Sequence, residues 1–244
     1  MMGGRRTIRG RIEHLIDPGS FREVGKLTGT GVYESGAVKA VVPAPYVMGV
    51  AKIRGRPVAI GGEDFTVRGG TSWGSDRRKG GQGGFIEDLA ANYRIPLVNL
   101  IDGSGGSVAS IRKRGHAIFP GVHGFDKSVE LMGIVPVVSA VMGVAAGGPA
   151  GRAILSHWSV MVTGQSQVFA AGPPIVERAL GLKVTREELG GVLRFLWLGA
   201  AGRYESLGDS GDRADDEDDG RSNGPRRSDD LRHFGPRRRD HFVV

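Results

Sequence analysis

Two apolar runs in this chain end in clusters of glycine, and this pattern constrains the fold more than any other feature. Residues 97–101 lead into Asp-Gly-Ser-Gly-Gly-Ser over 102–107, and residues 134–142 lead into Gly-Val-Ala-Ala-Gly-Gly-Pro over 143–149. Repetition of a strand, a glycine turn and a helix is typical of α/β domains, whose parallel strands are joined by crossovers. We therefore predict an α/β domain with both glycine turns at the carboxyl ends of strands, where such sheets bind ligands.

Hydrophobic spacing and turn residues predict the other elements of this domain. Helices are expected over 9–16, 85–93, 127–132, 150–157 and 173–180, and strands over 38–42, 47–53, 58–60 and 158–162. A turn at 54–57 joins two of these strands into a hairpin, and Thr185 with Glu188 forms a capping box at a further helix start. The inward faces expected for the first two helices are Ile12, Leu15 and Ile16, and Phe85, Leu89 and Tyr93.

Positive charge is concentrated in the first 191 residues. They hold 23 Lys and Arg against 15 Asp and Glu, while the formal net charge of the whole 244-residue chain is +7. A basic domain suits a polyanion, which could be a nucleic acid, a phosphate-rich cofactor or an anionic lipid. The same charge also fits a surface that only keeps the protein in solution.

Composition and the length of the apolar runs exclude several kinds of site. The chain has no Cys, so disulfides, thiolate nucleophiles and cysteine-based zinc sites are excluded. The histidines are dispersed along the chain, and we expect no metal site. No apolar run reaches the roughly 18–20 residues of a membrane helix, and no signal peptide is visible. We expect a cytoplasmic protein, or one of the mitochondrial matrix if the source is eukaryotic.

Residues 192–244 differ in composition from the part before them. They hold 10 Arg and 11 Asp and Glu but no Lys, and apolar side chains are sparse after Trp197. Such a segment buries too little surface to offset its chain entropy, so we expect a disordered low-complexity tail after a folded domain over 1–191. Because Arg, Gly, Asp and Pro have GC-rich codons, the tail could be an out-of-frame reading or a genuine extension.

The chemistry of the glycine turns is open from the residues alone. Backbone N–H groups of two different turns can converge into an oxyanion hole, but the clusters also suit tight turns without a ligand. A third feature, Gly-Thr-Ser-Trp-Gly over 70–74, matches the nucleophile elbow of serine hydrolases and would need Asp102 and His157 as partners of Ser72. The glycine-rich stretch up to residue 84 disfavours the helix that should follow such an elbow.

Six blocks of sequence occur in one order along the chain. They are RIEHLIDPGSFREVG (11–25), GRPV with DFTVRGGT (55–58 and 64–71), NLIDGSGG (99–106), VMGVAAGG (141–148), QVFAAGPP (167–174) and VTREELGG (184–191). Together they resemble the biotin-dependent acyl-CoA carboxyltransferase family, which includes the β subunits of propionyl-, acetyl- and methylcrotonyl-CoA carboxylases. The resemblance spans roughly residues 8–191 and implies a crotonase-like (ClpP/crotonase) fold of repeated ββα units.

The resemblance also implies an activity. Family members move CO2 from carboxybiotin to the α-carbon of an acyl-CoA, here of the propionyl-CoA or acetyl-CoA type, and hold the enolate with backbone N–H groups. The implied donors lie at Gly105, Gly106, Ser107, Gly147 and Gly148. Pro149 departs from the family pattern and has no N–H to donate. The biotin ureido group can accept the α-proton, so neither a side-chain base nor a metal is implied.

Partners follow from the same resemblance. Two basic triplets could bind CoA phosphates or could be solvated loops: Arg77, Arg78 and Lys79, and Arg112, Lys113 and Arg114. Family subunits contain two crotonase-like halves, and this chain matches the first, which chiefly holds acyl-CoA. The implied partners are a second carboxyltransferase half or subunit, a biotin carboxylase and a biotin carboxyl carrier protein, within a homo-oligomer.

Other functions stay open at this point. A crotonase-type decarboxylase of a carboxyacyl-CoA would use the same thioester site, and the chain could also be an inactive truncated subunit. The basic charge alone would suit a nucleic-acid-binding or scaffold protein. The resemblance favours acyl-CoA over nucleic acid or membrane as the ligand.

Overall fold

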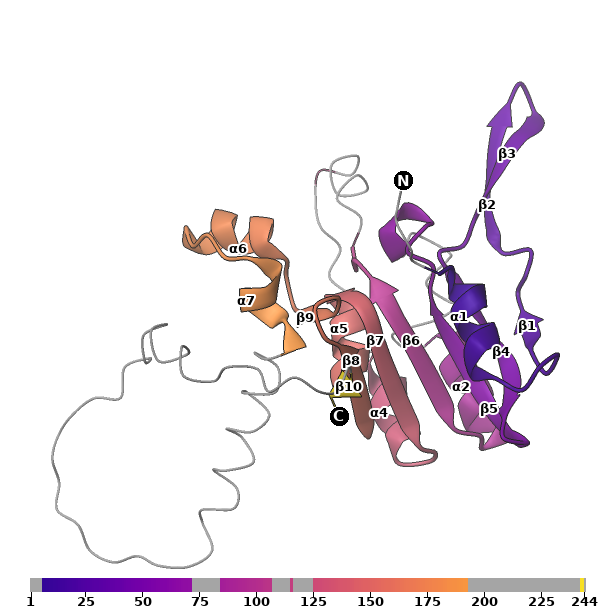
Figure 1. Cartoon of the computed structure of the whole chain (residues 1–244). Helices are drawn as coiled ribbons and strands as arrows, with labels where there is room; N and C mark the ends of the chain where they lie inside the picture. The colour runs from indigo at the N-terminus through magenta and orange to yellow at the C-terminus, as the bar shows by residue number, and fades with distance from the viewer. Residues whose placement is uncertain (1–5, 72–83, 107–114, 116–124, 193–241, 244) are drawn as a thin grey trace, which may run out of the picture.

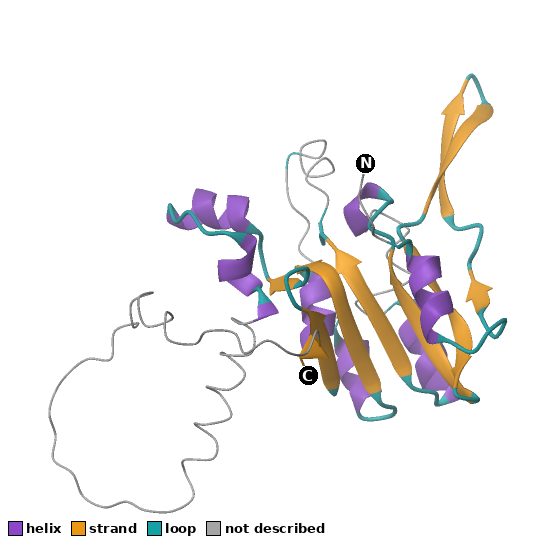
Figure 2. Ribbon diagram, viewed as in Figure 1, coloured by secondary structure: helices purple, strands orange, loops and turns teal. Residues whose placement is uncertain are grey.

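The computed structural model describes residues 6–71, 84–106, 115, 125–192 and 242–243. Its helices are α1 (Ile8–Leu15), η1 (Arg68–Gly70), α2 (Phe85–Tyr93), α4 (Asp126–Met132), α5 (Gly148–Ile154), α6 (Pro173–Leu180) and α7 (Arg186–Gly190). Its strands are β1 (Arg22–Val24), β2 (Gly29–Glu34), β3 (Ala37–Pro43), β4 (Tyr46–Ile53), β5 (Arg56–Glu63), β6 (Leu97–Gly103), β7 (Val137–Ala146), β8 (Trp158–Val162), β9 (Gln167–Phe169) and β10 (Phe242–Val243). All of them are drawn in Figures 1 and 2.

One mixed sheet organises the described part of the chain. Its strand order is β1-β4-β5-β6-β7-β8-β10, and β9 pairs with the far end of β7. The central pairs β5–β6, β6–β7 and β7–β8 are parallel, whereas β4 pairs antiparallel with both β1 and β5. Helices connect the parallel strands, so the prediction of an α/β domain with parallel strands and crossovers is confirmed.

The sheet is covered on both faces. On one face, α2 and α4 pack Ile86, Leu89 and Leu131 against strand side chains such as Leu97. On the other face, α1 packs against β4, β5 and β6 (Figure 1). Strand β6 lies in the middle and is buried along its whole length. A strand buried on both faces is what the continuous apolar run of residues 97–101 predicts.

The buried faces of the first two helices differ from the predicted ones. In α1, Ile12 and Ile16 are buried as expected, but Leu15 is 44% exposed and Ile8 takes its place in the core. In α2, Leu89 is buried, but Phe85 and Tyr93 are 47% and 72% exposed. The core of α2 is formed instead by Ile86, Leu89 and Ala90. Both errors have one cause: several apolar stripes fit each short helix, and only the position of the sheet selects one.

The first hairpin is tighter than predicted. Arg54 and Gly55 form the turn alone, both with positive φ (51° and 77°), while Pro57 already pairs with Lys52 in the ladder. The Asp17 carboxylate holds this turn by accepting the backbone N–H groups of Arg54 at 2.8 Å and Gly55 at 2.7 Å. Asp17, two residues after the end of α1, thereby joins that helix end to the β4–β5 hairpin.

The remaining elements agree with the prediction in part. The capping box of Thr185 and Glu188 is present as predicted, and strand 38–42 is confirmed as part of β3. Its partner β2 was not predicted, and the two form a separate hairpin that projects from the body (Figure 1). Helix α5 covers Gly148–Ile154, so it begins and ends earlier than the predicted 150–157.

The predicted boundary at residue 191 lies slightly too early. Val192 is buried against Ile101 and Val168, because its apolar side chain completes the cluster beside α5. At the other end of the predicted tail, Phe242–Val243 pairs antiparallel with β8. Residues 193–241 lie outside the described residues.

Two glycine substitutions should change stability in opposite directions. A Cβ on Gly62 would overlap the backbone oxygen of Leu100 and lie 2.7 Å from Cδ1 of Ile8, so Gly62→Ala should separate β5 from β6 and cost about 1–3 kcal/mol. A Cβ on Gly10 in α1 meets Thr7 Oγ1 at an ordinary 3.6 Å, so Gly10→Ala should stabilise by about 0.4–1 kcal/mol.

Urea unfolding of the two variants, followed by circular dichroism, measures both effects. A Gly62→Ala protein as stable as the parent would contradict the close packing of β5 on β6.

Candidate active site

The two glycine turns lie against each other at the carboxyl ends of β6 and β7. Gly103 pairs with Ala145 in the parallel ladder, so both strands end at the same edge of the sheet. Gly105 has φ 74°, and a Cβ there would overlap the backbone oxygen of Ala146 and lie 3.7 Å from Cα of Gly147. Glycine is required at this position because it combines a left-handed backbone with contact between the two turns.

The backbone donors of the second turn are divided between two tasks. The Gly147 N–H donates to the Phe169 oxygen at 3.2 Å, which ties β7 to β9. The first intrahelical bond of α5 runs from Gly151 to the Gly147 oxygen at 3.0 Å, so the N–H groups of Gly148 and Ala150 precede it. Pro149 is buried, and as a proline it has no N–H to donate. Of the two residues predicted here, Gly148 can donate to a ligand, whereas Gly147 shapes the turn.

The first turn has a packed side and an open side. Gly105 is buried against the second turn, whereas Gly106 is exposed and a Cβ on it would meet no atom of the described residues within 4 Å. Among these residues, the steric requirement for glycine therefore lies at Gly105 and not at Gly106.

Several predicted site residues lie outside the described residues. They are Ser107, Arg77, Arg78, Lys79, Arg112, Lys113 and Arg114. The structure therefore brings together Gly105, Gly106, Gly147 and Gly148 from the predicted set and does not place the phosphate-binding candidates.

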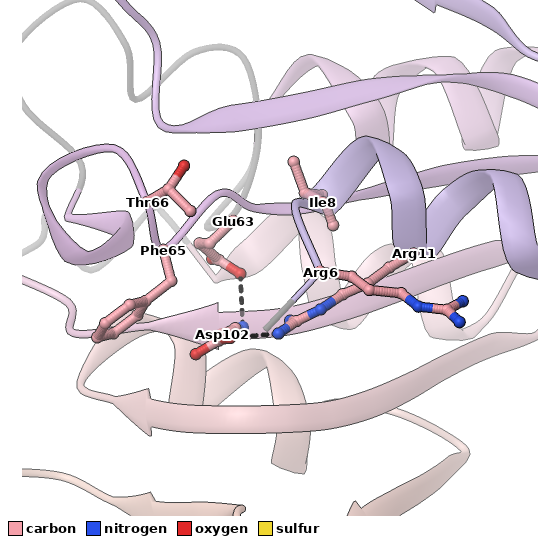
Figure 3. A pocket seen from close by; sticks show the side chains of 7 residues that line it. All are labelled: Arg6, Ile8, Arg11, Glu63, Phe65, Thr66 and Asp102. Atoms are coloured by element: carbon pink, nitrogen blue, oxygen red, sulfur yellow. Dashed lines mark hydrogen bonds and ion pairs between the residues drawn. The ribbon is translucent and has the colours of Figure 1, made fainter. Parts of the chain in front are cut away.

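Beneath the first turn lies a buried cluster of charges that the sequence analysis missed. Asp102, the residue before the turn, is 0% exposed, and its Oδ2 accepts Nη2 of Arg11 at 2.8 Å. The Asp102 N–H in turn donates to Oε2 of Glu63 at 3.4 Å. Figure 3 shows Asp102 between the Arg11 guanidinium from α1 and the Glu63 carboxylate from the end of β5.

Glu63 also reaches the second turn. Its Oε1 forms an ion pair with Nη2 of Arg152, which lies in α5 four residues after Gly148. Arg152 is buried, and its guanidinium lies 5.6 Å from the centre of the Tyr46 ring. Burial lowers the pKa of Arg152 and raises the pKa of the Tyr46 hydroxyl, because both charged forms lose their hydration there.

Glycines make the room for these carboxylates. A Cβ on Gly143 would overlap the Asp102 carboxylate, and one on Gly103 would lie 2.8 Å from Cγ of Glu63. A cavity of about 30 Å³ remains beside the cluster, lined by Arg6, Ile8, Arg11, Glu63, Phe65, Thr66 and Asp102 (Figure 3). That volume suits a water molecule rather than a substrate.

A weak sequence signal existed for part of this cluster. Asp102 directly follows a wholly apolar run, and a charge at that place needs a buried partner. Nothing in the sequence identifies Arg11, Glu63 or Arg152 as the partners, because they come from three other elements.

The geometry does not assemble the serine hydrolase triad. The His157 Nδ1 accepts the N–H of Val137 at 3.0 Å, which places His157 at the start of β7. Asp102 lies at the opposite, carboxyl end of the parallel strands and is already paired with Arg11. Ser72 lies outside the described residues, but its two nominated partners cannot serve one nucleophile.

In the described site, the glycine turns carry backbone N–H groups, and the charged side chains near them are buried and paired. Arg11, Glu63, Asp102 and Arg152 are all paired, and the Gly147 N–H is bonded to Phe169, so the donor left on the second turn ahead of the buried Pro149 is the Gly148 N–H. Peptide donors fixed in this way suit the stabilisation of an oxyanion.

Within the described residues, no three His, Asp or Glu side chains are grouped as metal ligands would be. Over the same part of the chain, the helices are too short or too polar to cross a membrane.

Comparisons with known proteins match most of this chain. The family model of the carboxyl transferase domain matches residues 2–196. The β chain of mitochondrial methylcrotonoyl-CoA carboxylase from Arabidopsis thaliana is 33% identical and aligns with 75% of this chain and 30% of its own length. The β chain of human mitochondrial propionyl-CoA carboxylase is 34% identical, over 77% of this chain and 34% of its own length.

A solved structure has a similar fold. The transcarboxylase 12S hexamer with hydrolysed methylmalonyl-coenzyme A bound is 32% identical, has a TM-score of 0.62, and aligns with 77% of this chain and 35% of that one. The chain thus spans about a third of the length of the relatives that it matches. The matched domain covers most of the sequence and contains both glycine turns, and the chain belongs to the carboxyl transferase family.

Proposed function

We propose that this chain is the acyl-CoA-binding part of a biotin-dependent carboxyltransferase with a crotonase-like fold. The substrate would be a short acyl-CoA of the propionyl-CoA or acetyl-CoA type. The observation that carries the proposal is the contact of Gly105 with Ala146 and Gly147, which places the turn after β6 against the turn that leads into α5. Such a pair of turns fits a thioester oxygen that becomes negative in the reaction.

The role of each turn follows from its hydrogen bonds. Because the Gly147 N–H is engaged by Phe169, we assign donation on the second turn to Gly148. On the first turn, the donors would be the N–H groups of Gly106 and Ser107, with Gly105 setting their direction. Carboxybiotin, delivered by a carrier protein, supplies CO2 and an acceptor for the α-proton, and the chain's own contribution is to hold the thioester oxygen while its charge develops.

Binding of CoA itself would be electrostatic. The basic excess of residues 1–191 and the two triplets at 77–79 and 112–114 suit the pyrophosphate and 3′-phosphate of CoA. Since the chain spans about a third of the length of these relatives, we propose that a second carboxyltransferase half completes the reaction site.

The first prediction compares two neighbouring glycines. Gly105→Ala should force an L-residue into φ 74° and push the two turns apart, whereas Gly106→Ala adds a Cβ to open space. In an assembly supplied with a second carboxyltransferase half, Gly105→Ala should lower kcat about 10²–10³-fold, as expected when one oxyanion donor is lost. Gly106→Ala is the steric comparison: it keeps the N–H that we propose as a donor, so it should retain at least a tenth of the parent rate. Equal rates for the two variants would contradict the role given to the turn.

The second prediction concerns the triplets. Replacing Arg77, Arg78 and Lys79 by Ala should weaken acyl-CoA binding, with a loss that shrinks as salt screens the charges. Calorimetric titration at low and high salt measures this, and the same change at Arg112, Lys113 and Arg114 is the comparison. If neither change alters affinity at low salt, the phosphate contacts lie elsewhere.

The third prediction separates binding from turnover. The chain alone should bind acyl-CoA but carboxylate it only when the second half and the biotin carrier are supplied. Radiolabelled bicarbonate incorporation with and without avidin tests this directly. Rapid carboxylation by the chain alone would overturn the proposal, and avidin-insensitive loss of CO2 from a carboxyacyl-CoA would favour the decarboxylase instead.

A further inference from the structure

We propose that Glu63 is a positioning residue that holds the two glycine turns in one fixed relation. This inference rests on the proposed function, because it concerns the geometry of the same backbone donors. Glu63 would not touch the substrate. It would act through Asp102, which precedes the first turn, and through Arg152, which follows the start of the second.

The two carboxylate oxygens of Glu63 serve different elements. Oε2 accepts the Asp102 N–H of β6 at 3.4 Å, and Oε1 pairs with the Arg152 guanidinium of α5. Glu63 is itself the last residue of β5, so a side chain from one strand reaches the ends of two others. Within the described residues, its contacts connect the first turn with the helix that begins at Gly148.

The space around Glu63 allows little movement. A Cβ on Gly70 would lie 3.0 Å from Cβ of Glu63, and one on Gly103 would lie 2.8 Å from its Cγ. Asp102 has a second anchor in Arg11, at 2.8 Å from a guanidinium whose side chain is only 9% exposed. The carboxylate is thus enclosed by backbone on one side and by charged partners on the other.

Helix α5 is fixed at its other end by hydroxyl groups. Ser156 Oγ donates to the Arg152 oxygen at 2.8 Å, Ser139 Oγ donates to the same oxygen at 3.3 Å, and Ser159 Oγ donates to the Ala153 oxygen at 2.5 Å. The Glu63–Arg152 ion pair adds a contact about one turn after Gly148, to a carboxylate at the end of β5. In our proposal this contact sets the direction of the Gly148 N–H.

A role in stability alone explains this arrangement less well. Buried ion pairs pay a large desolvation cost, and replacing one by apolar side chains is often neutral or stabilising. What an apolar pair cannot supply is the directional contact to both turns. The proposal therefore separates the two roles: removal of the pair as a unit should spare folding and disturb the turns.

The test uses the full chain and three variants. Glu63→Gln keeps the shape and removes the charge. Because it leaves Arg152 buried without a counter-charge, the double variant Glu63→Leu with Arg152→Met is made as well. The matched control is Glu23→Gln on the edge strand β1. Its carboxylate is equally buried, with 5% side-chain exposure, and pairs with Arg9 at 2.8 Å, three strands from β6 in the sheet order.

Two measurements accompany thermal unfolding and acyl-CoA affinity. The first is the stretching frequency of a carbon-13-labelled thioester carbonyl in bound propionyl-CoA, which falls when N–H groups polarise it. The second is amide hydrogen exchange of peptides covering 97–106 and 145–154, which needs no ligand. In the double variant we expect the affinity for acyl-CoA to stay within about threefold of the parent, a change of under 1 kcal/mol. The frequency shift of the thioester carbonyl should fall to about half of the parent's shift or less, and amide hydrogens should exchange faster at both turns. Glu23→Gln should match the parent in both.

Each outcome decides a separate point. A folded double variant with the parent's frequency shift and exchange would overturn the positioning role of Glu63. If the parent chain binds propionyl-CoA without any shift, the proposed function fails, while the exchange data still decide whether Glu63 orders the turns. If Glu23→Gln changes both readouts as much as the double variant does, the effect belongs to buried charge in general and the proposal falls.

Discussion

Two buried ion pairs, Glu63 with Arg152 and Asp102 with Arg11, connect the central strands of the sheet to the helices beside them. They join β5, β6, α1 and α5, and these elements contribute to all three clusters of the core. Four charges at this depth are costly unless each meets a partner in good geometry. Asp102 lies one residue before the end of β6 and Arg152 lies four residues after the start of α5, so the two pairs lie beside both glycine turns.

Glycine has three separate tasks around this cluster. At Gly62 it allows neighbouring strands to approach, at Gly143 it makes room for a buried carboxylate, and at Gly105 it supplies a left-handed backbone beside the second turn. These three glycines lie where strands, charges and turns meet. A single side-chain carbon at these places would disturb packing before it reached any ligand.

The division between buried charge and exposed backbone suits an oxyanion site. The charged side chains are paired below the turns, and the open edge presents peptide N–H groups, whose dipoles are fixed by the strand and helix that carry them. An arrangement of this kind binds developing negative charge without a titrating group of its own. It also explains why the chain needs a proton acceptor from elsewhere in the reaction that we propose.

The sequence by itself determined the class of the fold and the place of the candidate site. The apolar runs 97–101 and 134–142 predicted buried strands, and the structure has β6 over Leu97–Gly103 and β7 over Val137–Ala146, so the second strand begins and ends later than predicted. Because parallel strands bring their carboxyl ends to one edge, the sequence also predicted that the two glycine clusters lie near each other. Only the tertiary structure decided which stripe of α1 and α2 faces inward, which N–H of the second turn stays available, and which partners neutralise Asp102. The physical reason is distance along the chain. Arg11, Glu63 and Arg152 lie far from Asp102 in sequence, and neither periodicity nor turn chemistry relates residues that meet only when the sheet is complete.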